Sequence, residues 1–104
     1  MKDHRKLSPR QEVAAEDQLY SALLGLNEIK DLRAFFHDLC TPAELQAMKD
    51  RWAVVLLLEQ GLTYRQINAQ TGVSVTTIGR VARCLTGPEG GYRAALAQLE
   101  ENQS

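Results

Sequence analysis

Apolar side chains recur at helical spacing along most of the chain, which predicts helices and no strands. The first helix is expected from about Gln11 to Leu24, after the start signal Ser8-Pro9, and residues 1–10 are expected to form a flexible arm. A second helix is predicted for Asn27–Leu39, with Asn27 as its N-cap. The apolar positions of these two helices are Val13, Leu19, Tyr20, Leu23, Leu24, Ile29, Leu32, Phe35, Phe36 and Leu39.

The third predicted helix is apolar on every side for nearly two turns. It begins at Thr41-Pro42-Ala43-Glu44, which is typical of a capped helix start, and ends near Gln60, before Gly61. Its central run is Trp52-Ala53-Val54-Val55-Leu56-Leu57-Leu58. Because a surface helix in a lone small domain has one apolar stripe, we expect a partner chain to cover part of this run. Residues 11–60 are therefore predicted to form a dimerisation core, although a buried central helix of a monomer would show the same pattern.

Two short helices joined by a tight turn are predicted to follow. Thr63 caps the first, about Tyr64–Gln70, and Ser74 caps the second, about Val75–Thr86, with Gly72 at the turn between them. The residues expected to pack this pair together are Ile67, Val73, Val75, Ile78 and Val81. The spacing is typical of a helix-turn-helix motif, here residues 61–86. A last amphipathic helix is predicted for Tyr92–Glu101.

The distribution of charge favours contact between this motif and double-stranded DNA. The chain has 12 Lys and Arg against 13 Asp and Glu, a net charge of −1, yet no acidic residue occurs from Gly61 to Pro88. In such motifs the second helix enters the major groove by its N-terminal end, and the first begins near phosphates. Asn68 stands where a small Ala is common, so it either points to DNA or loosens the helix pair. The predicted DNA contacts are Thr63, Tyr64, Arg65, Asn68, Ser74, Val75, Thr76, Thr77, Arg80 and Arg83.

Length and composition restrict the remaining functions. The 104 residues, 44% of them hydrophobic, fit a single domain over residues 11–104. No apolar stretch reaches the roughly 20 residues of a membrane span, and the charged N-terminus lacks the apolar core of a signal peptide, so we expect a cytoplasmic protein with no membrane partner. Cys40 and Cys84 are expected to be reduced thiols. Neither a metal-binding pattern nor a catalytic arrangement is recognisable, so no metal and no enzyme activity are expected.

The order of these motifs resembles the Trp repressor superfamily. The resemblance rests on Cys40-Thr41-Pro42-Ala43-Glu44, on Arg51 and on the segment from Gly61 to Arg80. The runs RWAVVLLLEQGLTYRQI and RVARCLTGPEGGY are most similar to its YerC/YecD-type branch, and the likeness extends over Leu19–Glu100. It implies an all-α bundle of about six helices that forms an intertwined homodimer. It also implies a sequence-specific transcriptional regulator, expected to be a repressor, that binds a palindromic operator.

The same resemblance implies a corepressor pocket between the core and the helix-turn-helix. Thr41, Arg51 and Arg80 match a Thr and two Arg that line it, although Arg51 is equally suited to a surface ion pair and Arg80 to a phosphate contact. Val81 stands where Trp repressors have Gly, and Trp52 replaces a small aliphatic residue. Overfilling a tight site costs about 1–3 kcal/mol, so tight binding of free L-tryptophan is not expected, and another small corepressor stays open. The candidate pocket comprises Thr41, Arg51, Trp52, Arg80 and Val81.

Two other functions stay open at this point. One is a helical protein-interaction module that works by contacting another protein, without direct operator readout. The other is a small-molecule sensor whose ligand is not tryptophan. Binding of duplex DNA at low salt separates the first from a regulator, and a thermal-shift screen of amino acids and indoles identifies the second.

Overall fold

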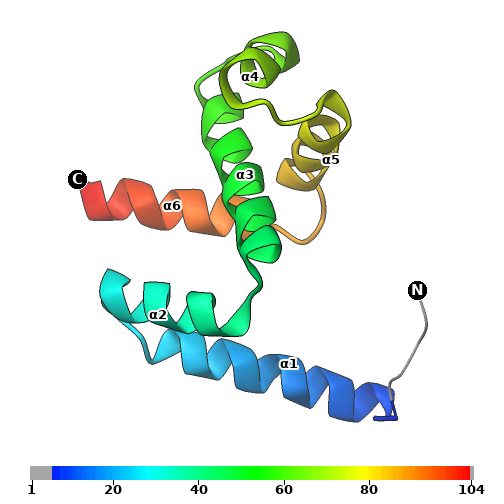
Figure 1. Ribbon diagram of the computed structural model, residues 1–104, viewed down its shortest axis with the longest axis vertical. Coiled ribbons are helices and arrows are strands. Elements are labelled where there is room, and N and C mark those ends of the chain that lie inside the picture. The colour runs from blue at the N-terminus through cyan, green and yellow to red at the C-terminus, as the bar shows by residue number, and fades with distance from the viewer. Residues whose placement is uncertain (1–5, 104) are drawn as a thin grey trace. The chain divides into compact units, whose positions relative to one another are not determined.

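The computed structural model of the protein describes residues 6–103, and within them it contains helices and no strand. This confirms the all-α fold. The chain divides into two compact units, Met1–Thr41 and Pro42–Ser104. The helices, shown in Figure 1, are α1 (Pro9–Leu24), α2 (Ile29–Leu39), α3 (Pro42–Glu59), α4 (Tyr64–Thr71), α5 (Val75–Leu85) and α6 (Gly91–Gln103). Over residues 6–103, no helix is both long and apolar enough to cross a membrane.

The first unit begins with a helix whose start is fixed by a capping box. The hydroxyl of Ser8 accepts the backbone N–H of Gln11 over 3.2 Å, and the Gln11 side chain accepts the N–H of Ser8 over 2.9 Å. Pro9 and Arg10 are therefore helical rather than part of an arm. Residues 1–5 of the predicted arm lie outside the described residues.

The N-cap of the second helix of this unit lies one residue later than predicted. Glu28 is its N-cap, because the Glu28 carbonyl accepts the first helical N–H groups, those of Asp31 and Leu32. The Glu28 side chain makes no capping hydrogen bond. The prediction of Asn27 as N-cap is therefore wrong, whereas the end at Leu39 is confirmed.

Neither helix of the first unit contains a buried residue. On α1, the hydroxyl of Tyr20 donates to a Glu16 carboxylate oxygen over 2.6 Å, and this bond raises the pKa of Tyr20 above its ordinary value. The exposed large apolar side chains of the unit are Leu7 (51%), Val13 (59%), Tyr20 (47%), Leu24 (86%), Ile29 (73%) and Leu39 (50%). The unit thus presents more apolar surface than surface helices usually leave uncovered.

The second unit has a core where α3, α4 and α5 meet. Val54 and Val55 of α3, Ile67 of α4 and Ile78 of α5 are all fully buried. Val73 in the turn, with Val81 and Leu85 farther along α5, completes this core. Helix α5 packs against α3, α4 and α6, which fixes its orientation within the unit (Figure 1). Part of the apolar run of α3 is therefore covered by the helix-turn-helix of the same chain.

Helix α6 is attached to α3 by two side-chain contacts. The guanidinium of Arg93 lies 3.0 Å from a carboxylate oxygen of Glu59. The rings of Trp52 and Tyr92 lie 6.2 Å apart between centroids, at a tilt of 42°. Leu96 packs on the core, so α6 adds apolar cover to the second unit.

Candidate nucleic-acid interface

The helix-turn-helix begins with a second capping box. The Thr63 hydroxyl accepts the N–H of Gln66 over 3.1 Å, and the Gln66 side chain accepts the N–H of Thr63 over 2.8 Å. This confirms Thr63 as the cap of α4. At the other end Gly72 adopts the left-handed conformation, with φ of 77°, that the tight turn requires.

Side-chain hydrogen bonds hold the turn between α4 and α5. The hydroxyl of Thr71 donates to the Ile67 carbonyl over 2.7 Å and accepts the N–H of Val73 over 3.0 Å. The Nδ2 of Asn68 donates to the Val73 carbonyl over 2.9 Å. Asn68 therefore ties α4 to the turn instead of loosening the pair. Its contact with DNA stays a prediction.

The N-terminal end of α5, residues 74–77, is called the α5 tip below. Ser74 caps the helix as predicted, because its hydroxyl accepts the N–H of Thr77 over 3.1 Å. The same hydroxyl donates to Oγ1 of Thr77 over 3.0 Å. These bonds hold the tip in one backbone conformation, with Ser74, Val75 and Thr76 exposed and Thr77 half-buried.

One residue of the tip departs from the prediction. Val75 has the same helical spacing as Ile78 and Val81, yet 55% of its surface is exposed while the other two are buried. The corner of the core is already filled by Val73, which precedes the helix. The prediction that Val75 packs the helix pair together is therefore wrong, and its side chain lies on the outside.

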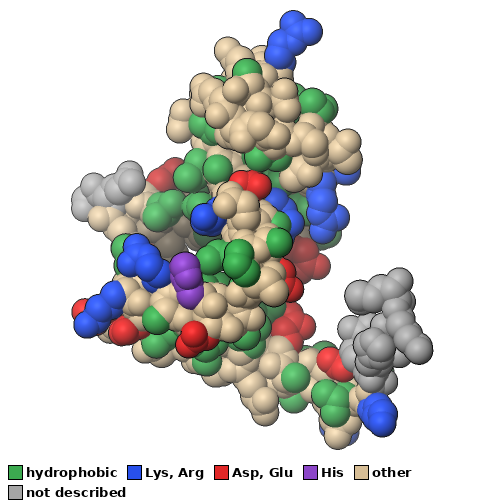
Figure 2. Space-filling model, viewed as in Figure 1, with side chains coloured by type: hydrophobic (Ala, Val, Ile, Leu, Met, Phe, Trp, Pro, Cys, Tyr) green, Lys and Arg blue, Asp and Glu red, His purple; other side chains and the backbone are tan. Residues whose placement is uncertain are grey.

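The three arginines of the motif are exposed and form no ion pair with any residue from 6 to 103. In the view of Figure 2 the upper part, formed by α4 and α5, carries basic and no acidic side chains. Arg83 and Tyr64 both lie next to Gly79: a Cβ placed there would be 3.5 Å from Nη1 of Arg83 and 3.9 Å from Cε2 of Tyr64. The fold thus brings the start of α4 and the second half of α5 to one surface.

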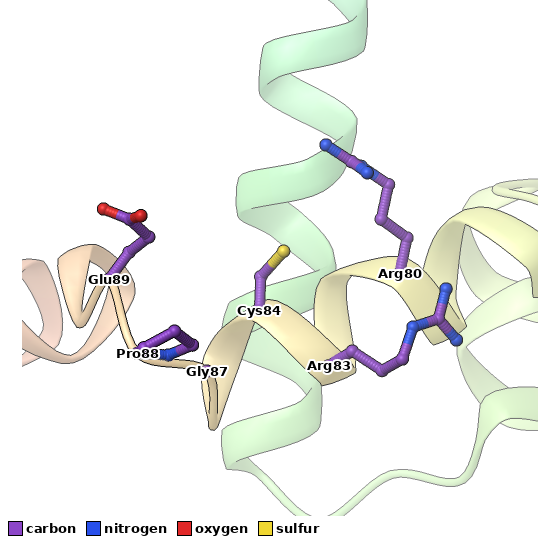
Figure 3. Close-up of a pocket in the computed structure, with 6 residues that line it drawn as sticks. All are labelled: Arg80, Arg83, Cys84, Gly87, Pro88 and Glu89. Carbon is purple, nitrogen blue, oxygen red and sulfur yellow. The ribbon is translucent and has the colours of Figure 1, made fainter.

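A cavity of about 210 Å³ lies at the other end of α5. Figure 3 shows Arg80 and Cys84 on the same side of the helix, with Arg83 projecting to another side. The lining residues are Arg80, Arg83, Cys84, Gly87, Pro88 and Glu89. A second cavity, of about 300 Å³, is lined by Cys84, Glu89, Gly91 and Tyr92.

Of the five predicted pocket residues, only Arg80 lines either cavity. Val81 is 1% exposed and belongs to the core, Trp52 packs against Tyr92, and Arg51 is half-buried on α3. Thr41 belongs to the first unit. The corepressor pocket therefore stays a prediction.

Cys84 and the residues of the α5–α6 connection line the first cavity, although none of them was predicted from the sequence as a pocket residue. Two signals were present. Cys84 follows Arg80 by four residues, which places both on one helical face. The helix break at Gly87-Pro88 comes less than one turn later.

Comparison with known proteins identifies the family. The sequence model of the Trp repressor protein family matches residues 14–100. The chain belongs to this family. It is 39% identical over 88 residues to the protein YerC of Bacillus subtilis (strain 168), with 85% of each chain covered. The predicted resemblance to the Trp repressor superfamily is thereby confirmed.

Solved structures show the same helical arrangement. A TrpR-like protein from Eubacterium eligens ATCC 27750 superposes with a TM-score of 0.79 at 33% identity, covering 89% of this chain and 96% of the other. A chain from Staphylococcus aureus gives the same TM-score and identity, with coverage of 90% and 96%. The Trp repressor family is a family of DNA-binding regulators, and its fold is the one described above.

Proposed function

We propose that this protein is a sequence-specific transcriptional regulator that binds a palindromic operator as a homodimer. The observation that carries the proposal is the α5 tip, which is exposed, held by its own cap and free of acidic residues. A helix end of this kind fits the major groove, where side chains reach the edges of the base pairs. Base selection is assigned to the tip, residues 74–77.

Phosphate binding is assigned to the exposed arginines Arg65, Arg80 and Arg83, with Thr63 and Tyr64 at the start of α4. No carboxylate neutralises these guanidinium groups among the described residues. Two copies of the chain would neutralise about six phosphates, so a plot of log affinity against log salt should have a slope of about −5. A much steeper slope would show that basic residues elsewhere also contact DNA.

The homodimer is supported by the apolar side chains that the first unit leaves exposed. Leu24 and Ile29 are 86% and 73% exposed, although large apolar residues normally find cover. A second copy supplies matching apolar surface through a two-fold axis. Such a dimer would hold two α5 tips about 34 Å apart, the separation of successive major grooves on one face of a duplex.

The direct test is selection of random duplexes by the purified protein, followed by affinity measurements on the recovered sequence. We expect a palindrome. Thr76→Glu places a negative charge on the tip and should weaken binding by at least about tenfold, because it would face the phosphates and base edges. The matched control is Gln18→Glu, which adds the same charge to an exposed position of α1 and should change affinity by less than about twofold.

Failure of the chain to bind any duplex at low salt would contradict the proposal. Capture of a different protein chain by the purified protein, combined with that failure, would instead favour the interaction module. A sequence-independent affinity, equal for the selected and a scrambled duplex, would contradict the assignment of base selection to the tip.

A further inference from the structure

One apolar side chain lies at the α5 tip without a place in the core. Val75 is 55% exposed, whereas Ile78, Val81 and Leu85 of the same helix are buried. The exposed isopropyl group therefore adds little burial to the fold. Because a β-branched side chain in a helix has one strongly preferred rotamer, the tip presents this group in a nearly fixed direction.

The hydroxyl group of Ser74, next to Val75, is already engaged within the protein. The hydroxyl of Ser74 accepts the N–H of Thr77 and donates to Oγ1 of Thr77, over 3.1 and 3.0 Å. Thr76 makes no hydrogen bond to any residue from 6 to 103 through its side chain. The tip therefore offers a partner the isopropyl of Val75, the side chain of Thr76 and the hydroxyl hydrogen of Thr77, and of these the isopropyl group of Val75 is the largest apolar group.

B-DNA displays one apolar group in its major groove, the C5-methyl of thymine. The other groups there are hydrogen-bond donors and acceptors, and an isopropyl group would remove water from them without replacing the lost hydrogen bonds. We propose that Val75 recognises the C5-methyl group of a thymine in each half of the operator. This inference rests on the proposed function, and it adds the chemical group that the tip selects.

The test uses the operator recovered by selection, in which each thymine is replaced in turn by deoxyuridine, at symmetric positions of both halves. Deoxyuridine lacks only the C5-methyl group. At one thymine position we expect the affinity of the wild-type protein to fall by about fourfold per half-site. This is the loss expected when the protein no longer buries one methyl group. Affinity is measured by fluorescence anisotropy at constant salt, because phosphate contacts change strongly with salt.

Two variants assign the effect to Val75. Val75→Ala should bind the thymine and deoxyuridine operators equally at that position, because the isopropyl group is gone. Gln70→Ala changes an exposed residue of α4 that is not assigned to DNA contact, and it should keep the wild-type preference for thymine. Both positions are exposed, so both variants should fold, which circular dichroism checks.

Equal binding of both operators by the wild-type protein would overturn the inference while leaving the proposed function intact. So would a Val75→Ala variant that keeps the full preference, or a recovered operator without thymine in its half-sites. Absence of any recovered operator would contradict the proposed function itself, and this inference with it.

Discussion

Replacement of Asn68 by Ala removes the bond that ties α4 to the turn. The Nδ2 of Asn68 donates to the Val73 carbonyl over 2.9 Å in a partly buried position. A hydrogen bond of this kind contributes about 1 kcal/mol net, so the free energy of unfolding should fall by that amount. For a chain of this length the melting temperature should fall by roughly 4–8 °C. Asn68→Asp keeps the shape but places an acceptor against the carbonyl, and should be more destabilising.

The assay is urea unfolding followed by circular dichroism at one fixed protein concentration, because the stability of a dimer depends on concentration. Gln70→Ala is the control, since Gln70 is exposed on the same helix, and its free energy of unfolding should change by less than about 0.5 kcal/mol. The opposite outcome is an Asn68→Ala variant that keeps wild-type stability and yet loses affinity for the operator. That result would place Asn68 at the DNA rather than at the turn.

Three further predictions concern single positions. Gly72→Ala should lower the free energy of unfolding by about 1–2 kcal/mol, because it forces a side chain into the left-handed conformation; an unchanged urea midpoint would contradict this. Gly79→Ala should raise the free energy of unfolding by about 0.5–1 kcal/mol, because Ala favours helix. The new Cβ would lie 3.5 Å from Nη1 of Arg83, an ordinary contact. A lower urea midpoint would show that a side chain does not fit at this position. Calorimetric titration with free L-tryptophan should detect no micromolar binding, since the resemblance implies a Gly at the position that the larger Val81 fills; a micromolar Kd would overturn that prediction.

The ends of the helices in the second unit were predictable because their causes are local. Thr63, Gly72 and Ser74 act on backbone groups within four residues of themselves, and the hydrogen bonds that they were expected to make are present. Ser8 and Pro9 likewise mark the start of α1. Such caps need no knowledge of what the helix packs against, which is why the residue types alone indicate them.

Burial was less predictable because it depends on what lies opposite each residue. Val75 shares the spacing of Ile78 and Val81, but Val73 already occupies the corner of the core. The cavity beside Cys84 was not predictable for the same reason. Residues of α5 and of the α5–α6 connection as far as Glu89 line it. The path of that connection depends on how α6 packs and not on residue spacing along the chain.

The mass of the free protein decides whether two chains together hold a pair of α5 tips for one operator. Light scattering coupled to size-exclusion chromatography, in dilute solution without DNA, measures it. We expect a species of twice the chain mass of 11.6 kDa. A single species at 11.6 kDa would show that the chain does not form the proposed homodimer.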